Sequence, residues 1–140
     1  MTTRLHLAEA LAEHYHAGQF YGVNMNYFQY HITGVVNQMK VHNMNEEALI
    51  VAFLHDIIED TSCSIETIKS LFGESIANAV LAITKTPGED RDTYLSRCAK
   101  NKLARVVKLH DALFNATNCL KNKNIEKYNY YLDTISKLRA

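Results

Sequence analysis

The stretch Ala52–Thr61, AFLHDIIEDT, joins the end of a strongly apolar helix to a concentration of titratable side chains. Within six positions it carries one imidazole and three carboxylates, His55, Asp56, Glu59 and Asp60. The apolar positions that lead into it are nearly continuous, which is typical of a helix buried on most of its surface. We therefore predict that this helix is the centre of the fold, with these residues in the core: Leu49, Ile50, Phe53, Leu54 and Ile57.

The charged residues of this stretch lie where an ordinary helix would not hold them. On a continuous helix His55 shares a face with Glu59, because residues four apart are neighbours. Asp56 and Asp60 are related in the same way and would repel each other. Glu59 and Asp60 would also face the negative end of the helix dipole. A bound cation would resolve the conflict, and the alternative is a solvated helix end that binds nothing.

His31 lies on an apolar helix face upstream of this stretch. A helix is predicted over residues 28–42, and its inner face carries four apolar side chains: Ile32, Val35, Val36 and Met39. A lone histidine on such a face is more often a hydrogen-bonded core residue than a ligand. The helix position alone leaves both interpretations open.

A third polar group interrupts the apolar helix predicted over residues 101–120. Its core stripe is formed by Leu103, Val106, Val107, His110, Leu113 and Phe114. Lys108, Asp111 and Asn115 run along the edge of this stripe. Asp111 can simply pair with Lys108, an interaction worth only about 0.3–0.5 kcal/mol on a surface. However, Asn115 lies one turn after Asp111, so that two polar side chains project together.

The remaining sequence predicts an all-α protein. It has one proline and five glycines, no internal repeat and no Asn-Gly or Asp-Gly hairpin turn. A loop rich in glycine and asparagine is expected over residues 17–26. We predict a single domain of residues 1–140 with about seven to eight helices, near residues 5–15, 28–42, 46–60, 64–71, 74–84, 91–99, 101–120 and 124–138.

The composition excludes several classes of protein. Lysine plus arginine and aspartate plus glutamate number 15 each, so the formal net charge is zero and no basic excess favours nucleic acid. Three widely spaced cysteines without a CxxC pair are typical of reduced thiols rather than disulfides or a zinc site. The first residues contain no long apolar segment, so we expect no signal peptide, and no apolar run is long enough to predict a membrane span. A soluble, cytoplasmic protein is predicted.

The order His31, His55-Asp56, Asp111 resembles the H…HD…D pattern of the HD-domain metal-dependent phosphohydrolases. More closely, the chain resembles the Rel/Spo-type alarmone hydrolases, including their small stand-alone members. The shared motifs occur in family order and cover about residues 7–120: HAGQ (16–19), an aromatic-rich approach to His31, LHDIIEDT (54–61), LFG (71–73), ITK (83–85) and VKLHDALFN (107–115).

This resemblance implies an HD-domain helical bundle that binds one divalent ion, usually Mn²⁺, through His31, His55, Asp56 and Asp111. It implies that Glu59 and Asp60 are the catalytic acids, which position and deprotonate the attacking water. Asn115 matches the substrate-side asparagine of the family next to the metal, and Lys85 is predicted as a second substrate contact. The implied reaction removes the 3′ pyrophosphate of a guanosine or adenosine 3′,5′-bis-phosphorylated nucleotide, the ppGpp or ppApp class.

The chain also departs from the family pattern. An Arg-Lys pair commonly follows HxGQ and meets the substrate phosphates, but here residues 20–26 read FYGVNMN. The arginine that usually follows the last metal ligand is Ala112. Lys85, Arg91 or Lys108 could supply phosphate contacts instead, although each could equally be a surface charge.

Three functions therefore compete. The leading one is an Mn²⁺-dependent alarmone hydrolase. The second is an HD phosphohydrolase for another nucleotide, and the third is a non-catalytic nucleotide-binding regulator. The expected partner is a small nucleotide, with no nucleic acid and no membrane. Tyr128, Tyr130 and Tyr131 form either core packing or the face of a homodimer.

The other histidines have structural interpretations. His16 is predicted to support the site without binding the metal directly. His6, His14 and His42 are predicted to face solvent, and His110 lies on the core stripe.

Overall fold

The core forms around α3 (Glu46–Leu54), in which every residue from Ala48 to Leu54 is buried. Its start is set by Asn45, whose side chain accepts a hydrogen bond from the Ala48 amide at 2.9 Å. Glu46 and Glu47 occupy the first turn, where the helix dipole favours negative charge. Because α3 is apolar all round, other helices must cover it on every side, and this confirms its predicted central position.

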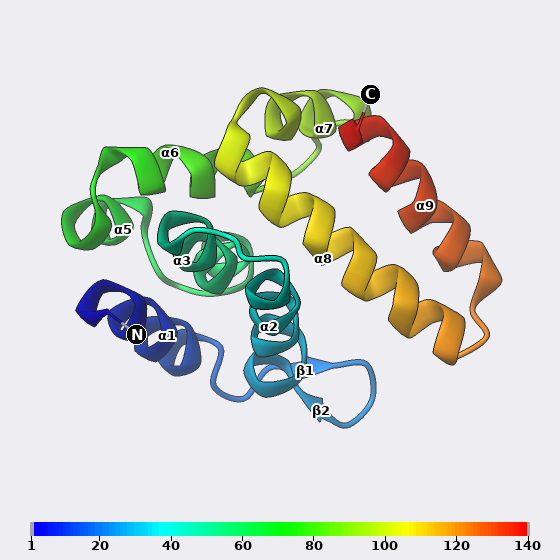
Figure 1. Ribbon diagram of the computed structural model, residues 1–140, viewed down its shortest axis with the longest axis horizontal. Helices are drawn as coiled ribbons and strands as arrows, with labels where there is room; N and C mark the ends of the chain where they lie inside the picture. The colour runs from blue at the N-terminus through cyan, green and yellow to red at the C-terminus, as the bar shows by residue number, and fades with distance from the viewer. Residues whose placement is uncertain (1, 140) are drawn as a thin grey trace.

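The computed structural model describes residues 2–139 and is mostly helical (Figure 1). The helices α1 (Thr3–Tyr15), α2 (Thr33–Val41), α6 (Glu74–Ile83) and α8 (Lys102–Lys121) contact α3, while α9 (Ile125–Arg139) runs alongside α8 (Figure 1). The prediction of an all-α protein is confirmed. The elements are α1 (Thr3–Tyr15), β1 (Phe20–Tyr21), β2 (Met25–Asn26), η1 (Tyr27–Ile32), α2 (Thr33–Val41), α3, α4 (Ile57–Asp60), α5 (Ile65–Phe72), α6 (Glu74–Ile83), α7 (Arg91–Lys100), α8 (Lys102–Lys121) and α9 (Ile125–Arg139).

The predicted helix over residues 46–60 is interrupted at His55 and Asp56. Asp56 has φ −106° and ψ 1°, outside the helical region, and α4 begins only after it. The ring nitrogen Nδ1 of His55 donates to the carbonyl of Ala52 at 2.6 Å and so competes with the backbone for that acceptor. The prediction of one continuous helix was therefore wrong. Glu59 lies in a separate short helix and not at the negative end of α3.

Two further segments differ from the prediction. The π-helix η1 (Tyr27–Ile32) replaces the first five residues of the helix predicted over 28–42, and a π-helical turn is frequently found at functional sites. The loop predicted over 17–26 contains a small hairpin, in which β1 pairs antiparallel with β2. Gly22, with φ +65°, allows the tight turn between the two strands. Leu113, predicted in the core stripe of α8, is 37% exposed.

Gly34 allows α2 to pack closely against α8. A Cβ atom at this position would lie 2.4 Å from Cε2 of Phe114, whose ring also packs against His31 and Tyr30. We expect Gly34→Ala to lose about 1–3 kcal/mol through overpacking and to regain about 1 kcal/mol in helix propensity. The net result is a lower free energy of unfolding, measurable by urea denaturation.

The matched control for this prediction is the same change in a Phe114→Leu background. There the clash is relieved, so Gly34→Ala should become neutral or stabilising. A stabilising effect of Gly34→Ala in the wild-type background would contradict the packing argument.

Within residues 2–139, none of the helices combines the length and the apolar character that a membrane crossing requires.

Candidate metal centre

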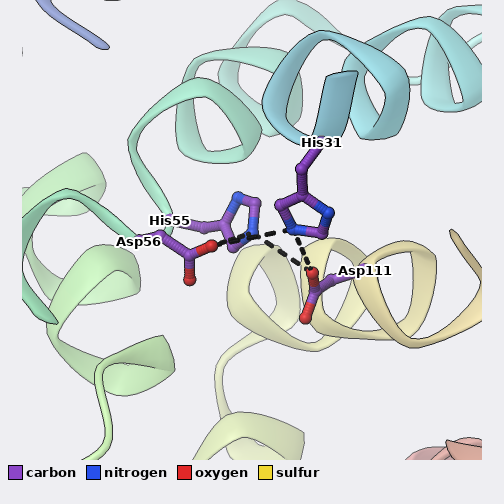
Figure 2. Close-up of side chains that lie close together, drawn as sticks. All are labelled: His31, His55, Asp56 and Asp111. Carbon is purple, nitrogen blue, oxygen red and sulfur yellow. Dashed lines mark ion pairs between the residues drawn. The ribbon is translucent and has the colours of Figure 1, made fainter. Parts of the chain in front are cut away.

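Four side chains from three parts of the chain converge beside α3 (Figure 2). His31 comes from η1, His55 and Asp56 from the break after α3, and Asp111 from α8. His31 Nε2 lies 2.9 Å from Asp111 Oδ1 and 3.7 Å from Asp56 Oδ2. His55 Nε2 lies 3.2 Å from the same Asp56 oxygen and 3.4 Å from the same Asp111 oxygen. The structure thus brings together the four residues that the sequence predicted as ligands.

The geometry of this cluster fits a divalent cation. Because Nδ1 of His55 donates to the Ala52 carbonyl, the neutral imidazole presents a lone pair at Nε2. That buried atom makes no hydrogen bond of ordinary geometry within residues 2–139. The four ligand atoms lie within 4.8 Å of one another. Ligands at about 2.1 Å from an ion and at right angles are about 3 Å apart, so the cluster could hold such an ion.

Within the cluster the imidazoles and the carboxylates stabilise each other's charged forms. Burial by itself would lower the pKa of His55, but the Asp56 and Asp111 carboxylates outweigh it and raise this pKa well above its usual range. Burial would raise the pKa of Asp56, but the adjacent imidazoles, His55 above all, hold it well below its usual range. A proton on the imidazole therefore compensates the carboxylates, and a divalent cation would take over that role.

Asp111 uses its two oxygens differently. The Lys108 ammonium lies 3.3 Å from Oδ2, while Oδ1 faces the two imidazoles. Asn115 Nδ2 also donates to Oδ1, at 3.4 Å. The two interpretations of Asp111 that the sequence left open are thus compatible, since one carboxylate both pairs with Lys108 and joins the cluster. Burial would raise the pKa of Asp111, but Lys108 and the imidazoles keep it well below its usual range.

Glu59 and Asp60 lie next to the cluster without belonging to it. Both side chains line a cavity of about 470 Å³, which Asp56 and Asp111 also line. Glu59 Oε1 accepts a hydrogen bond from the backbone amide of Lys85 at 2.9 Å. Partial burial, together with the Asp56 charge, raises the pKa of both Glu59 and Asp60. Both carboxylates therefore have a higher proton affinity than a solvated carboxylate.

The cavity combines an acidic end with an aromatic and amide wall. Beyond the four acidic residues its wall is formed by Tyr21, Gly22, Tyr27, His31, Asn115, Asn118, Cys119, Asn122, Asn124, Lys127 and Tyr131. A second cavity of about 190 Å³ shares Glu59, Asn115 and Tyr131 with the first. This combination of hydrogen-bonding groups and flat rings suits a nucleotide, whose base can stack while its phosphates approach a cation.

The predicted phosphate-contacting side chains line only the smaller cavity. Lys85, Arg91 and Lys108 all line it. Arg91 is held by Asp133 at 2.7 Å and by the Tyr130 carbonyl at 3.1 Å, and Lys108 is held by Asp111. Lys85 is exposed, and its side chain is the most accessible of the three.

Sequence reasoning missed two tyrosines that contact the site. Tyr27 donates its hydroxyl hydrogen to Asp56 Oδ2, and Tyr21 donates to Asn115 Oδ1 at 2.6 Å. Burial, and then the Asp56 charge, raises the pKa of Tyr27, so that its hydroxyl stays protonated. The signal available in the sequence was the density of aromatic residues before His31.

The remaining histidines occupy their predicted surroundings. His16 is buried, bonds Gln19 Oε1 at 2.7 Å and lies outside the cluster. His110 is buried and bonds Gln38 at 2.8 Å. Three histidines are exposed, as predicted: His6, His14 and His42.

The family model described as HD domain matches residues 8–115, and the chain belongs to this family. Its relatives include a probable guanosine-3′,5′-bis(diphosphate) 3′-pyrophosphohydrolase of Synechocystis, 40% identical over 82 residues. That match covers 50% of this chain and 11% of the relative. The guanosine-3′,5′-bis(diphosphate) 3′-pyrophosphohydrolase MESH1 of Drosophila melanogaster is 33% identical over 76 residues, which cover 51% of this chain and 42% of MESH1.

A solved structure of a metazoan ortholog of SpoT that hydrolyzes ppGpp has a similar fold. The TM-score is 0.84 at 22% identity, and the alignment covers 100% of this chain and 88% of the other. The predicted HD-domain helical bundle is thereby confirmed, and the similarity to the ppGpp hydrolases extends from short motifs to the whole fold.

Proposed function

We propose that residues 1–140 form one hydrolase domain, which removes the 3′ pyrophosphate of a purine alarmone nucleotide of the ppGpp or ppApp class with the help of one Mn²⁺ ion. The observation that carries the proposal is the cluster of two imidazoles and two carboxylates at the acidic end of a nucleotide-sized cavity. The names of the relatives from Synechocystis and Drosophila support the substrate class.

In this proposal His31, His55, Asp56 and Asp111 hold the ion. A divalent ion held there would lower the pKa of a bound water and polarise a phosphoryl oxygen. His55 is already committed to the required tautomer by the Ala52 carbonyl. The burial of both imidazoles excludes competing water from the ligand atoms. The two carboxylates suit Mn²⁺, and the absence of a thiolate ligand from the cluster fits a metal of that kind.

Glu59 and Asp60 orient the attacking water and accept its proton. Their raised pKa values make both carboxylates better proton acceptors near neutral pH than solvated ones. The Lys85 amide fixes one oxygen of Glu59, and Gln19 Nε2 donates to Asp60 Oδ2 at 3.2 Å. Each carboxylate therefore keeps one oxygen free for the water.

Asn115 and Lys85 contact the substrate. Asn115 uses one amide hydrogen for Asp111 and its carbonyl for Tyr21, so a second amide hydrogen remains available for a phosphate or sugar oxygen. The exposed Lys85 side chain lies at the smaller cavity, beside Glu59. Its ammonium would neutralise charge on the pyrophosphate.

A second candidate is hydrolysis of another nucleotide with fewer phosphates. Lys127 is the single lysine or arginine among the described residues that line the larger cavity. A substrate with two diphosphate groups would find little positive charge there apart from the metal ion.

The test is pyrophosphate release from ppGpp and from ppApp, each incubated with purified protein and Mn²⁺. We expect release from at least one of them and none without the ion, and Mg²⁺ and Zn²⁺ in parallel test the choice of metal. No release from either alarmone would overturn the alarmone proposal. Turnover of another nucleotide in the same assay would then support the second candidate, and tight nucleotide binding without turnover would indicate a non-catalytic regulator.

A further inference from the structure

The segment between α1 and α2 supplies hydrogen-bond donors to the candidate metal centre. Three of its side chains each donate to one polar residue of the site. The pairs are Gln19 to Asp60, Tyr21 to Asn115, and Tyr27 to Asp56. This segment thus lines one side of the site, and the three contacts are hydrogen bonds donated by neutral side chains.

The contact of Tyr27 reaches the cluster itself. It joins the phenolic hydroxyl to Asp56 Oδ2, the same oxygen that lies 3.2 Å from His55 Nε2. Among residues 2–139, no other hydroxyl, amide or ammonium group donates to the Asp56 side chain. Asp111, by contrast, has both Lys108 and Asn115. Asp56 therefore depends on a single outer hydrogen bond.

Asp56 also needs such a restraint more than the other three ligands. Its side chain is 20% exposed, whereas those of His31, His55 and Asp111 are 7% exposed or less. Its backbone lies in the break between α3 and α4, outside any helix. A short aspartate side chain at such a position can rotate away from the ion unless a neighbour holds it.

The Tyr27 ring is held firmly enough to provide the restraint. Its centroid lies 5.1 Å from those of both the His16 and the His31 rings. Tyr27 begins η1, and the Asn26 side chain caps this helix by accepting from the Gln29 amide at 2.9 Å. The hydroxyl is therefore directed at Asp56 by a rigid support.

We propose that Tyr27 is a positioning residue that orients Asp56 for metal binding. This inference rests on the metal site of the proposed function, but not on which nucleotide is the substrate. Hydrogen bonds to metal-binding carboxylates usually contribute 10- to 100-fold to metal affinity. We therefore expect Tyr27→Phe, which removes only the hydroxyl, to raise the Kd for Mn²⁺ by about 10- to 100-fold.

The experiment is a calorimetric titration of the metal-free protein with Mn²⁺, in the absence of any nucleotide. Wild type, Tyr27→Phe and Tyr30→Phe are compared. Tyr30 is the matched control, because it lies in the same π-helix and its hydroxyl donates to Asn118 at 2.7 Å, away from the cluster. We expect a weaker Kd for Tyr27→Phe alone, while all three metal-free proteins keep the helical circular dichroism of a folded chain.

The outcomes separate this inference from the function on which it rests. If wild type binds no Mn²⁺, the Mn²⁺-dependent function fails, and the inference with it. If wild type binds Mn²⁺ and Tyr27→Phe binds it equally well, only the inference is overturned. An equal loss in Tyr27→Phe and Tyr30→Phe would indicate general packing of η1 and would also overturn it.

A second variant covers a failure of Tyr27→Phe to fold. Tyr27→Met also lacks the hydroxyl, but its flexible side chain adapts to an irregular space. Loss of Mn²⁺ affinity in a folded Tyr27→Met protein supports the inference, and wild-type affinity overturns it.

Discussion

Replacing Asp56 by alanine is expected to abolish pyrophosphate release and to weaken Mn²⁺ binding by more than about 100-fold, beyond the usual effect of losing an outer hydrogen bond. In the proposed site, Asp56 would supply one of the two carboxylates that balance the charge of the ion. Without it, two imidazoles and one carboxylate remain, and the site loses both a ligand and a negative charge. The measurements are pyrophosphate release and calorimetric titration with Mn²⁺ on the same preparation.

Asp92→Ala is the matched control, because it removes an exposed aspartate that contacts Lys137 at 2.7 Å and lines neither of the two cavities at the site. It should leave both release and Mn²⁺ affinity at wild-type values. Circular dichroism of Asp56→Ala checks that the helices remain. Full Mn²⁺ affinity in a folded Asp56→Ala protein would rule out Asp56 as a ligand.

Replacing Glu59 by glutamine should lower kcat by about 10²- to 10⁴-fold, the usual contribution of a general base. The amide keeps the shape of the side chain and can still accept the hydrogen bond from the Lys85 amide. It cannot accept a proton. Since Glu59 lies outside the four-residue cluster, the Kd for Mn²⁺ should remain within about twofold of wild type. Steady-state kinetics and Mn²⁺ titration measure the two effects separately.

Glu13→Gln, at an exposed position of α1, is the control for loss of one negative charge and should have wild-type kcat. Asp60→Asn in the same series shows how much each of the two acids contributes to kcat. If Glu59→Gln turns over at the wild-type rate, the assignment of the base to Glu59 is wrong. If wild type shows no turnover and Glu59→Gln still binds nucleotide, a non-catalytic nucleotide-binding regulator describes the protein better than an enzyme does.

The sequence by itself determined the centre of the fold and the four residues that cluster beside it. Local patterns carry this information: a continuous apolar run predicts a buried helix, and Asn45 with two following glutamates predicts its start. The four clustered residues were found because their types and order in the chain resemble those of a known family. The clash of charges around Asp56 and Asp60 pointed to the same place, although the continuous helix assumed in that argument does not form.

Tertiary structure alone decided how the site is supported. The break at Asp56 depends on the hydrogen bond from the His55 ring to the Ala52 carbonyl. The periodicity of apolar residues contains no information about such a bond. Whether Asp111 pairs with Lys108 or joins the imidazoles could not be chosen from the sequence, because one carboxylate does both. The contact of Tyr27 with Asp56 joins residues 29 positions apart. Helical spacing predicts neighbours within a turn, whereas contacts between elements exist only once the helices have packed.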